Sequence, residues 1–250
     1  HKIIHKRLLH LADRSAATLG TFGFRAFVDS APVLEKALAS KAGLGWMGKH
    51  TVILNRSAGS YFFLGELFTD LPLPVDEPVS SHCGSCQACI DICPTQAIVA
   101  PYTLDAGKCI SYLTIEYRGV IPLELRRAIG NRIFGCDDCQ LVCPWNRYAQ
   151  ASQESAFTPR HAFDGPPLLD LWAWDEPTWL KQTEGMPLRR MNYASWLRNL
   201  SIALGNAPQS PEILAALQAR KQSLAEHGQL DAVLAEHLDW AIAEQALTPR

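Results

Sequence analysis

All eight cysteines of this 250-residue chain lie between Cys83 and Cys143. The first four follow the spacing C-x2-C-x2-C-x3-C from Cys83 to Cys93, and Pro94 comes next. Bacterial two-cluster ferredoxins use this run to bind 4Fe-4S clusters, with three thiolates on one cluster and the fourth on the other. The run therefore predicts a second array of cysteine ligands further along the chain.

A second array is present, but it lacks one ligand. Cys136, Cys139 and Cys143, followed by a proline, repeat the last three cysteines of the run, and Ile133 stands where the first would be. Cys109 is the only cysteine left in the sequence. The sequence thus predicts two 4Fe-4S clusters with no thiolate to spare. Their ligand sets are Cys83, Cys86, Cys89 with Cys143, and Cys93, Cys109, Cys136 with Cys139.

Three other uses of the cysteines fit this pattern less well. Disulfides are typical of small secreted domains, whereas these cysteines leave long cysteine-free flanks able to form a core of their own. The C-x2-C pairs would also suit zinc, but the Cys-Pro endings and the crossed ligand sets are ferredoxin features. Radical chemistry on S-adenosylmethionine would need a C-x3-C-x2-C motif, and neither Cys89 nor Cys139 begins one.

Composition sets only broad limits on function. A hydrophobic content of 48% is ordinary for a globular protein, and a net charge of −2 gives no global sign of nucleic-acid binding. No run of about 18 apolar residues is present, so we expect no membrane span. The sequence opens at His1 directly in an amphipathic pattern, as expected for a chain cut from a longer protein, so targeting information could lie upstream.

Residues 1–75 alternate between helical and extended patterns, which predicts an α+β segment. Ser30-Ala31-Pro32 has the form of a helix cap followed by an early proline. The expected helices are 2–19 and 31–42, and the expected strands are 25–28, 51–54 and 61–64.

The proline-rich stretch 71–78 suits neither a helix nor a central strand, and it predicts a linker. From about Pro159 the pattern is helical, with apolar stripes over 193–204 and 230–242. Gly205-Asn206-Ala207-Pro208 should close the first of these helices. We therefore expect domains at 1–75, 76–150 and 151–250.

The string Gly43-x-Gly45-x-x-Gly48 matches the dinucleotide-binding fingerprint only as letters. That fingerprint needs a strand before it and a helix after it, whereas here a helix precedes and a strand follows. The sequence favours a glycine loop that lets backbone approach a flat cofactor, or simply a tight turn.

Some polar residues have both an ordinary and a functional reading. Asp29 lies where a strand meets a helix start, which suits an N-cap or a solvated side chain as well as a general acid. Arg189, Arg190 and Arg198 lie in a stretch without acidic residues, which suits phosphate contacts or a plain solvated face. His237 falls near the last apolar stripe and is predicted to be a core histidine.

Four segments together closely resemble the epoxyqueuosine reductase family, and the match runs across almost the whole chain. They are Phe27–Glu35 (FVDSAPVLE), Gly43–Thr51 (GLGWMGKHT), Cys109–Glu116 (CISYLTIE) and Gly135–Asn146 (GCDDCQLVCPWN). The family is similar to reductive dehalogenases in using cobalamin beside two 4Fe-4S clusters. The resemblance implies an oxidoreductase that reduces an epoxide to an alkene on an anticodon-loop base of tRNA, the last step in making queuosine.

The resemblance also implies an architecture: a partial cobalamin-binding α/β domain, a ferredoxin-like two-cluster domain and a HEAT-like helical tail. The family carries a further segment before the position of His1, which completes the cobalamin domain. Asp29 matches the family's proton donor, and Arg118, Arg189, Arg190 and Arg198 would contact tRNA. The implied cobalamin pocket comprises Asp29, Ile53, Leu64, Ser111, Cys136 and Asp137. A cytoplasmic monomer that receives electrons from an external reductase or another low-potential donor is expected.

The sequence is also compatible with two other functions. One is a ferredoxin-type electron carrier with structural flanks, which would bind no cobalamin. The other is a reductive dehalogenase that acts on a small organohalide, although a basic helical tail favours tRNA as the substrate.

Overall fold

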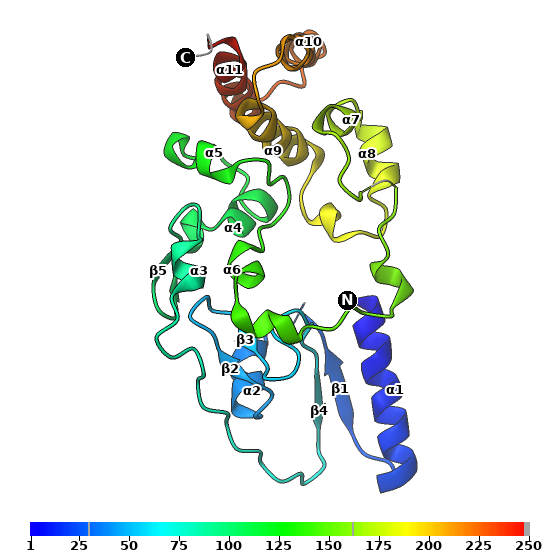
Figure 1. Ribbon diagram of the computed structural model, residues 1–250. Helices are drawn as coiled ribbons and strands as arrows, with labels where there is room; N and C mark the ends of the chain where they lie inside the picture. The colour runs from blue at the N-terminus through cyan, green and yellow to red at the C-terminus, as the bar shows by residue number, and fades with distance from the viewer. Residues whose placement is uncertain (30, 162, 248–250) are drawn as a thin grey trace. The chain divides into compact units, whose positions relative to one another are not determined.

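The computed structural model describes residues 1–29, 31–161 and 163–247 (Figure 1). The chain forms two compact units. The first unit comprises His1–Ile92, Ile98–Leu104 and Asp138–Ala151, and the second comprises Cys93–Ala97, Asp105–Asp137 and Ser152–Arg250. These units divide the segment between residues 76 and 150, which was expected to be one domain.

The first unit begins with a long helix beside a two-stranded sheet. Helix α1 (Lys2–Leu19) contacts strand β1 (Phe24–Phe27), which pairs antiparallel with β4 (Glu66–Thr69). Gly65 precedes β4, and a Cβ there would come within 3.4 Å of side chains of α1 and of Val28. The lack of a side chain thus lets the sheet approach the helix.

The remaining elements of the first unit are short. Helix α2 (Glu35–Lys41) leads into an antiparallel pair, β2 (Trp46–Met47) and β3 (Ile53–Leu54). The cysteine-rich parts contribute α3 (Ala88–Asp91), β5 (Ile98–Ala100), β6 (Thr103–Leu104), α6 (Asp138–Leu141) and the 3-10 helix η2 (Pro144–Tyr148). Helices α3 and α6 contact each other, which brings two of the cysteine segments together.

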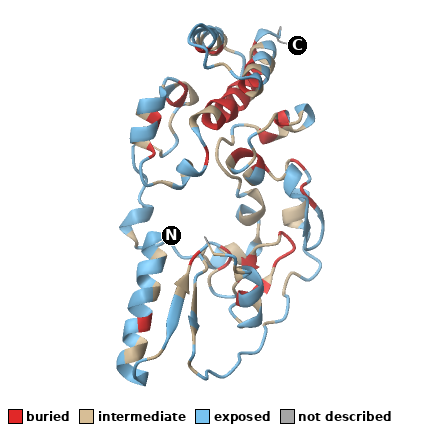
Figure 2. Cartoon of the chain, turned by 180° about the vertical axis from the view of Figure 1, so that it is seen from behind, coloured by how far each residue is buried: buried red, intermediate tan, exposed pale blue. Residues whose placement is uncertain are grey.

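The second unit is helical and is built around α9 (Tyr193–Asn206), in which Ser195–Gly205 is buried throughout (Figure 2). A helix that is buried on nearly all sides must be surrounded by other elements. Its neighbours include α4 (Ile110–Ile115), α5 (Leu123–Ile129), α7 (Leu168–Trp172), α8 (Glu176–Gln182), α10 (Pro211–Glu226) and α11 (Ala232–Ala246). The 3-10 helices η1 (Ala106–Lys108), η3 (Ser155–Phe157) and η4 (Pro187–Arg190) complete this unit.

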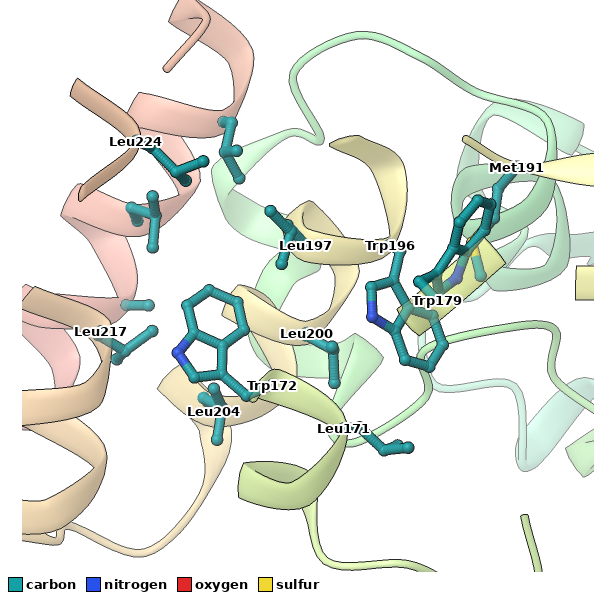
Figure 3. Packing of buried hydrophobic residues seen from close by; sticks show 13 residues of the cluster. Leu171, Trp172, Trp179, Met191, Trp196, Leu197, Leu200, Leu204, Leu217 and Leu224 are labelled. Carbon is teal, nitrogen blue, oxygen red and sulfur yellow. The ribbon is translucent and has the colours of Figure 1, made fainter. Parts of the chain in front are cut away.

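Large side chains on both sides of α9 form the main core. Figure 3 shows Trp172, Trp196 and Leu200 packed among leucines from several helices. Trp196 is fully buried, and its ring stacks on Trp174 at a centroid distance of 5.8 Å. Burial of such large apolar side chains is the main source of stability for this unit.

Side-chain caps set where the long helices of the second unit begin. The side chain of Asn192 accepts a hydrogen bond from the Ser195 amide at the start of α9, and Asp231 accepts one from Leu234 at the start of α11. Ser210 caps α10 in the same way. These residues occupy amide groups that a helix leaves without partners at its N-terminus.

The mixed α+β class is confirmed, and the chain is mostly helical. Helix 2–19 was predicted correctly, and both apolar stripes of the tail became helices. The strand predicted at 61–64 is wrong, because β1 pairs with residues 66–69 instead. The second helix starts at Glu35, four residues later than predicted, and Ser30 of its expected cap lies outside the described residues.

Every helix in the described ranges is too short or too polar to cross a lipid bilayer.

His237 is fully buried, as predicted, and it connects α11 to the segment before α5. Its Nε2 accepts a hydrogen bond from the Ile121 amide at 3.1 Å, and its Nδ1–H donates to the Val233 carbonyl at 2.6 Å. The contact with Ile121 requires the neutral ring, because a protonated Nε2 cannot accept a hydrogen bond. Burial, chiefly, lowers the pKa of His237 from 6.5 to about 4.

We predict that His237→Gln flattens the acid limb of the stability profile. Below about pH 6.5 the unfolded chain binds a proton at His237 that the folded chain does not. The free energy of unfolding therefore decreases as the pH is lowered. Between about pH 7 and about pH 5.5 this loss should be about 1 kcal/mol in the wild type. Urea unfolding followed by circular dichroism measures it. Equal pH slopes in His237→Gln and wild type would contradict the prediction, and His227→Gln, at an exposed histidine, is the matched control.

Candidate functional site

Four cysteines of the first unit line a single cavity of about 230 Å³, here called the thiol cavity. Cys83 and Cys86 lie in the turn before α3, Cys89 lies in α3, and Cys143 directly precedes η2. The other lining residues are Lys49, His50, Leu54, His82, Ala88, Pro144, Trp145 and Arg147. The structure therefore brings together the four thiols predicted from spacing as the first ligand set.

Two thiols of this cavity, those of Cys89 and Cys143, have raised pKa values. Burial is the main cause that raises the pKa of Cys89, and the neighbouring thiolates of Cys143, Cys83 and Cys86 raise it further. Burial also raises the pKa of Cys143. Amide hydrogen bonds from the following turn lower it, but burial has the larger effect. Four thiolates can occupy this space together only if a positively charged iron core offsets their repulsion. The donor set thus fits a 4Fe-4S cluster.

A single metal ion fits the cavity less well. Among the described residues, no group of three or more His, Cys, Asp or Glu side chains converges closely enough to hold one ion. Zinc would need sulfur ligands at about 2.3 Å around one point. The spread of the four thiols around the cavity instead suits a bulky cluster.

Lys49 anchors the backbone of the cysteine turn. Its Nζ donates hydrogen bonds to the carbonyl oxygens of Gly84 at 2.7 Å and Cys86 at 2.8 Å. The side chain is buried, with 8% of the residue exposed. A buried ammonium group is tolerated where it has such partners. Lys49 therefore holds the turn that carries Cys83 and Cys86.

The glycine-rich string leads into this anchor and forms no dinucleotide site. Helix α2 precedes it, β2 lies within it and β3 follows, so a helix comes before the string and a strand after it, as the sequence predicted. A Cβ at Gly45 would lie 2.1 Å from the Leu54 carbonyl oxygen, and one at Gly48 would lie 2.6 Å from Cε1 of His50. The glycines thus allow a tight β2–β3 pair that places Lys49 and His50 at the thiol cavity.

Asn146 connects the last cysteine segment to a turn earlier in the first unit. Its Oδ1 accepts hydrogen bonds from the Ser60 amide at 2.6 Å and from the Ser60 hydroxyl at 3.2 Å. Its Nδ2 donates to the carbonyl oxygen of Gln140 at 2.6 Å. No role at this site was predicted for Asn146, Lys49 or His50, although they lie within Gly43–Thr51 and Gly135–Asn146, two of the segments that carry the family resemblance.

The second predicted ligand set is distributed over both units. Cys93, Cys109 and Cys136 belong to the second unit, and Cys139 belongs to the first. The Sγ of Cys93 accepts a hydrogen bond from the Ala97 amide at 3.2 Å, and Cys109 stands at the start of α4. Cys93 and Cys109 thus have defined local settings, and the grouping of the four thiols on one cluster stays a prediction.

Ser111 holds the Cys136 turn through both of its backbone groups. The Ser111 hydroxyl accepts a hydrogen bond from the Cys136 amide at 3.0 Å and donates to the Cys136 carbonyl oxygen at 3.2 Å. Asp29, Ile53 and Leu64, the other predicted pocket residues besides Asp137, belong to the first unit. Ile53 is buried, and Leu64 is half-buried.

Asp29 lies on the loop after β1 with a left-handed backbone, φ 57°. Glu35 Oε1 accepts a hydrogen bond from its amide at 2.5 Å, and His1 Nε2 lies 2.9 Å from its carboxylate Oδ2. The side chain is 49% exposed. An N-cap role is wrong, because α2 begins at Glu35 with Leu34 as its cap residue. A left-handed non-glycine residue is strained, and such strain often occurs at functional loops.

The prediction that Arg198 contributes to an exposed basic surface is wrong. Its guanidinium is buried and donates to the carbonyl oxygens of Leu113, Tyr117 and Gly119, so it connects α9 to the segment after α4. Burial, chiefly, lowers the pKa of Arg198 to about 10. No phosphate contact is possible from this position.

The other three predicted RNA-contacting arginines are exposed. Arg118 donates to the Arg190 carbonyl oxygen at 2.6 Å, and the Arg190 guanidinium lies 2.6 Å from Glu116. Arg189 lies over the ring of Trp179. The structure therefore places Arg118 and Arg190 side by side.

Comparison with known proteins identifies relatives of the cysteine segment and of the whole chain. Residues 82–146 match the family described as 4Fe-4S double cluster binding domain. Epoxyqueuosine reductase from Pseudomonas aeruginosa is 59% identical over 249 residues, which cover 99% of this chain and 67% of that protein.

Two solved structures have a similar fold. Epoxyqueuosine reductase from Bacillus subtilis, with its catalytic aspartate loop swung out of the active site, matches with a TM-score of 0.82 and 29% identity, over 98% of this chain and 63% of that one. An epoxyqueuosine reductase with a tRNA-Tyr epoxyqueuosine-modified tRNA stem loop matches with a TM-score of 0.80 and 26% identity, over 99% and 72%. The chain spans about two thirds of the length of these relatives.

We predict that Lys49→Met selectively weakens the first cluster. The change removes the donor from the carbonyl oxygens of Gly84 and Cys86, and it loosens the turn that carries Cys83 and Cys86. Iron per chain after anaerobic reconstitution should fall from about eight toward about four, because only one cluster depends on this turn. The matched control is Lys41→Met, at an exposed position of α2. Full iron content with unchanged cluster spectra in Lys49→Met would refute the anchoring role.

Proposed function

Because the chain belongs to the epoxyqueuosine reductase family, we propose that it reduces epoxyqueuosine in the anticodon loop of tRNA to queuosine. The observation that carries the proposal is the thiol cavity, which lies within a segment that matches a double-cluster domain. A relative of similar fold has been solved with a tRNA stem loop that bears this modified base.

Reduction of the epoxide to an alkene consumes two electrons and two protons and releases water. Iron-sulfur clusters transfer one electron at a time, so a second centre is needed next to the substrate. Cobalamin supplies that centre when it is bound, since it can hold the reducing equivalents that the epoxide accepts. This chain's part is to hold the clusters, place the cofactor and substrate, and deliver protons.

We propose the same two ligand sets that the cysteine spacing predicts. The first, Cys83, Cys86, Cys89 and Cys143, rests on the thiol cavity. The second, Cys93, Cys109, Cys136 and Cys139, rests on the crossed pattern of two-cluster ferredoxins. With eight cysteines in the chain, each cluster then has four ligands.

The cobalamin pocket proposed contains Asp29, Ile53, Leu64, Ser111, Cys136 and Asp137. Two local features suit this role. The hydrogen bonds between Ser111 and Cys136 fix the turn before Asp137, so its backbone is preorganised for a ligand. Ile53 lies in β3, and we propose that the backbone around it meets the cofactor.

Asp29 is proposed as the acid that protonates the epoxide oxygen as the carbon–oxygen bond breaks. Its carboxyl group is half-exposed on a loop, so it can reach a bound substrate. Glu35 holds the backbone of the same loop through the Asp29 amide. The catalytic aspartate of the Bacillus subtilis relative also lies on a loop, and that loop moves.

We predict that Asp29→Asn slows epoxide reduction by roughly 10²-fold or more, the usual scale for a lost general acid. Cluster content, cobalamin binding and tRNA affinity should stay unchanged. Single-turnover reduction of tRNA bearing epoxyqueuosine, with nucleoside analysis, measures the rate. Asp13→Asn, on the exposed face of α1, is the matched control. A wild-type rate in Asp29→Asn would remove this residue from the mechanism.

Arg118, Arg189 and Arg190 are proposed as phosphate contacts of the tRNA. All three are exposed, and an exposed guanidinium can form paired hydrogen bonds to a phosphate group. Arg118 and Arg190 lie together, so they would meet neighbouring phosphates. Such contacts strengthen binding without reading the base sequence.

We predict that the double variant Arg189→Gln/Arg190→Gln weakens tRNA binding and reduces its salt dependence. Each lost phosphate contact should lower the slope of log K against log salt by about 0.7 to 0.9. Filter binding over a range of salt concentrations measures the slope. Arg127→Gln, at an exposed arginine that is paired with Glu244, is the control for the loss of a single positive charge. Identical slopes in the double variant and wild type would place the tRNA elsewhere.

A tRNA substrate implies a cytoplasmic enzyme. The electrons must come from an external reductase or another low-potential donor, and we propose that the protein acts as a monomer.

A further inference from the structure

His50 is a buried histidine at the thiol cavity with an unused donor. Only 3% of the residue is exposed, and its Nδ1 accepts a hydrogen bond from the Val52 amide at 3.1 Å. Because Nδ1 is an acceptor, the proton of the neutral ring must be on Nε2. Nε2 has no hydrogen-bond partner within the described part of the chain. A buried N–H group without an acceptor is rare in folded proteins.

The cavity supplies the missing kind of partner. His50 lines it together with Cys83, Cys86, Cys89 and Cys143. Thiolate and sulfide sulfurs of a 4Fe-4S cluster carry negative charge and accept hydrogen bonds. His82 lines the same cavity, and its Nε2 accepts a hydrogen bond from the Arg56 guanidinium at 3.0 Å, so its own N–H is on Nδ1. Among the described residues that line the cavity, His50 is the histidine whose ring nitrogen is both fully buried and without a partner.

We infer that the Nε2–H of His50 donates a hydrogen bond to a sulfur of the first cluster and raises the reduction potential of that cluster. Reduction adds negative charge to the sulfurs, so a fixed N–H dipole stabilises the reduced form more than the oxidised form. His50 acts through the cluster, so it is a positioning and tuning residue.

The end of the glycine-rich string positions the His50 ring. A side chain at Gly48 would collide with the His50 ring, at 2.6 Å from Cε1 and 3.0 Å from Nδ1. The adjacent Lys49 anchors the Cys83–Cys86 turn through two carbonyl groups. Gly48, Lys49 and His50 thus form one short element that both shapes the first cluster's ligand turn and tunes its potential.

Redox titration of reconstituted variants tests the potential. His50→Leu removes the donor, and the potential of one cluster should become more negative by about 59 mV, a tenfold change for one electron and the scale of one hydrogen bond to a charged group. His50→Gln keeps an amide N–H at a similar reach and should restore most of the potential. Equal potentials in His50→Leu and wild type, with both clusters present, would overturn the inference.

Hyperfine spectroscopy of the reduced protein, labelled with ¹⁵N-histidine, tests the hydrogen bond even if His50→Leu fails to assemble the cluster. We expect a ¹⁵N coupling to the first cluster in wild type that disappears in His50→Gln. The matched variant His82→Gln, at the same cavity, should keep it. A wild-type spectrum without ¹⁵N coupling, or a coupling that persists in His50→Gln, would overturn the inference.

Discussion

The mutual repulsion of four thiolates in one cavity is the constraint on which the first unit depends. Cys83, Cys86, Cys89 and Cys143 converge from segments far apart in the sequence, and burial and neighbouring charge both oppose ionisation of Cys89. An iron-sulfur core removes that penalty because its positive charge lies between the sulfurs. The protein supplies the rest: Lys49 on the ligand turn and Asn146 beside the last cysteine.

The meeting of Cys83, Cys86, Cys89 and Cys143 at one cavity could be predicted from the sequence, because a cluster binds short turns whose cysteine spacing is visible in the chain. Lys49 could not, since its two carbonyl partners lie 35 and 37 residues further on. Arg198 was misplaced for a related reason. A count of charges in a window says nothing about burial, and this guanidinium satisfies backbone carbonyls in the core of the second unit. Strand β4 was missed because its partner, β1, is distant in sequence.

The glycine-rich string Gly43–Gly48, which resembles a nucleotide-binding fingerprint, therefore helps to shape the thiol cavity. Gly45 lets β2 and β3 approach, Lys49 binds the ligand turn and His50 faces the thiol cavity. Asp29 contrasts with these buried groups, because it is half-exposed on a strained loop. Under the proposed function, electrons would come from the cysteine turns that Lys49 anchors, whereas the proposed proton donor lies on an accessible loop that can meet a large RNA substrate.

The central claim is that these parts together reduce epoxyqueuosine in tRNA. The most direct measurement is nucleoside analysis after anaerobic incubation of the cluster-loaded chain with tRNA bearing epoxyqueuosine, reductant, and cobalamin either added or omitted. The account predicts that queuosine forms with cobalamin and that epoxyqueuosine remains unchanged without it. Unchanged epoxyqueuosine in a sample that contains both clusters and bound cobalamin would contradict the account.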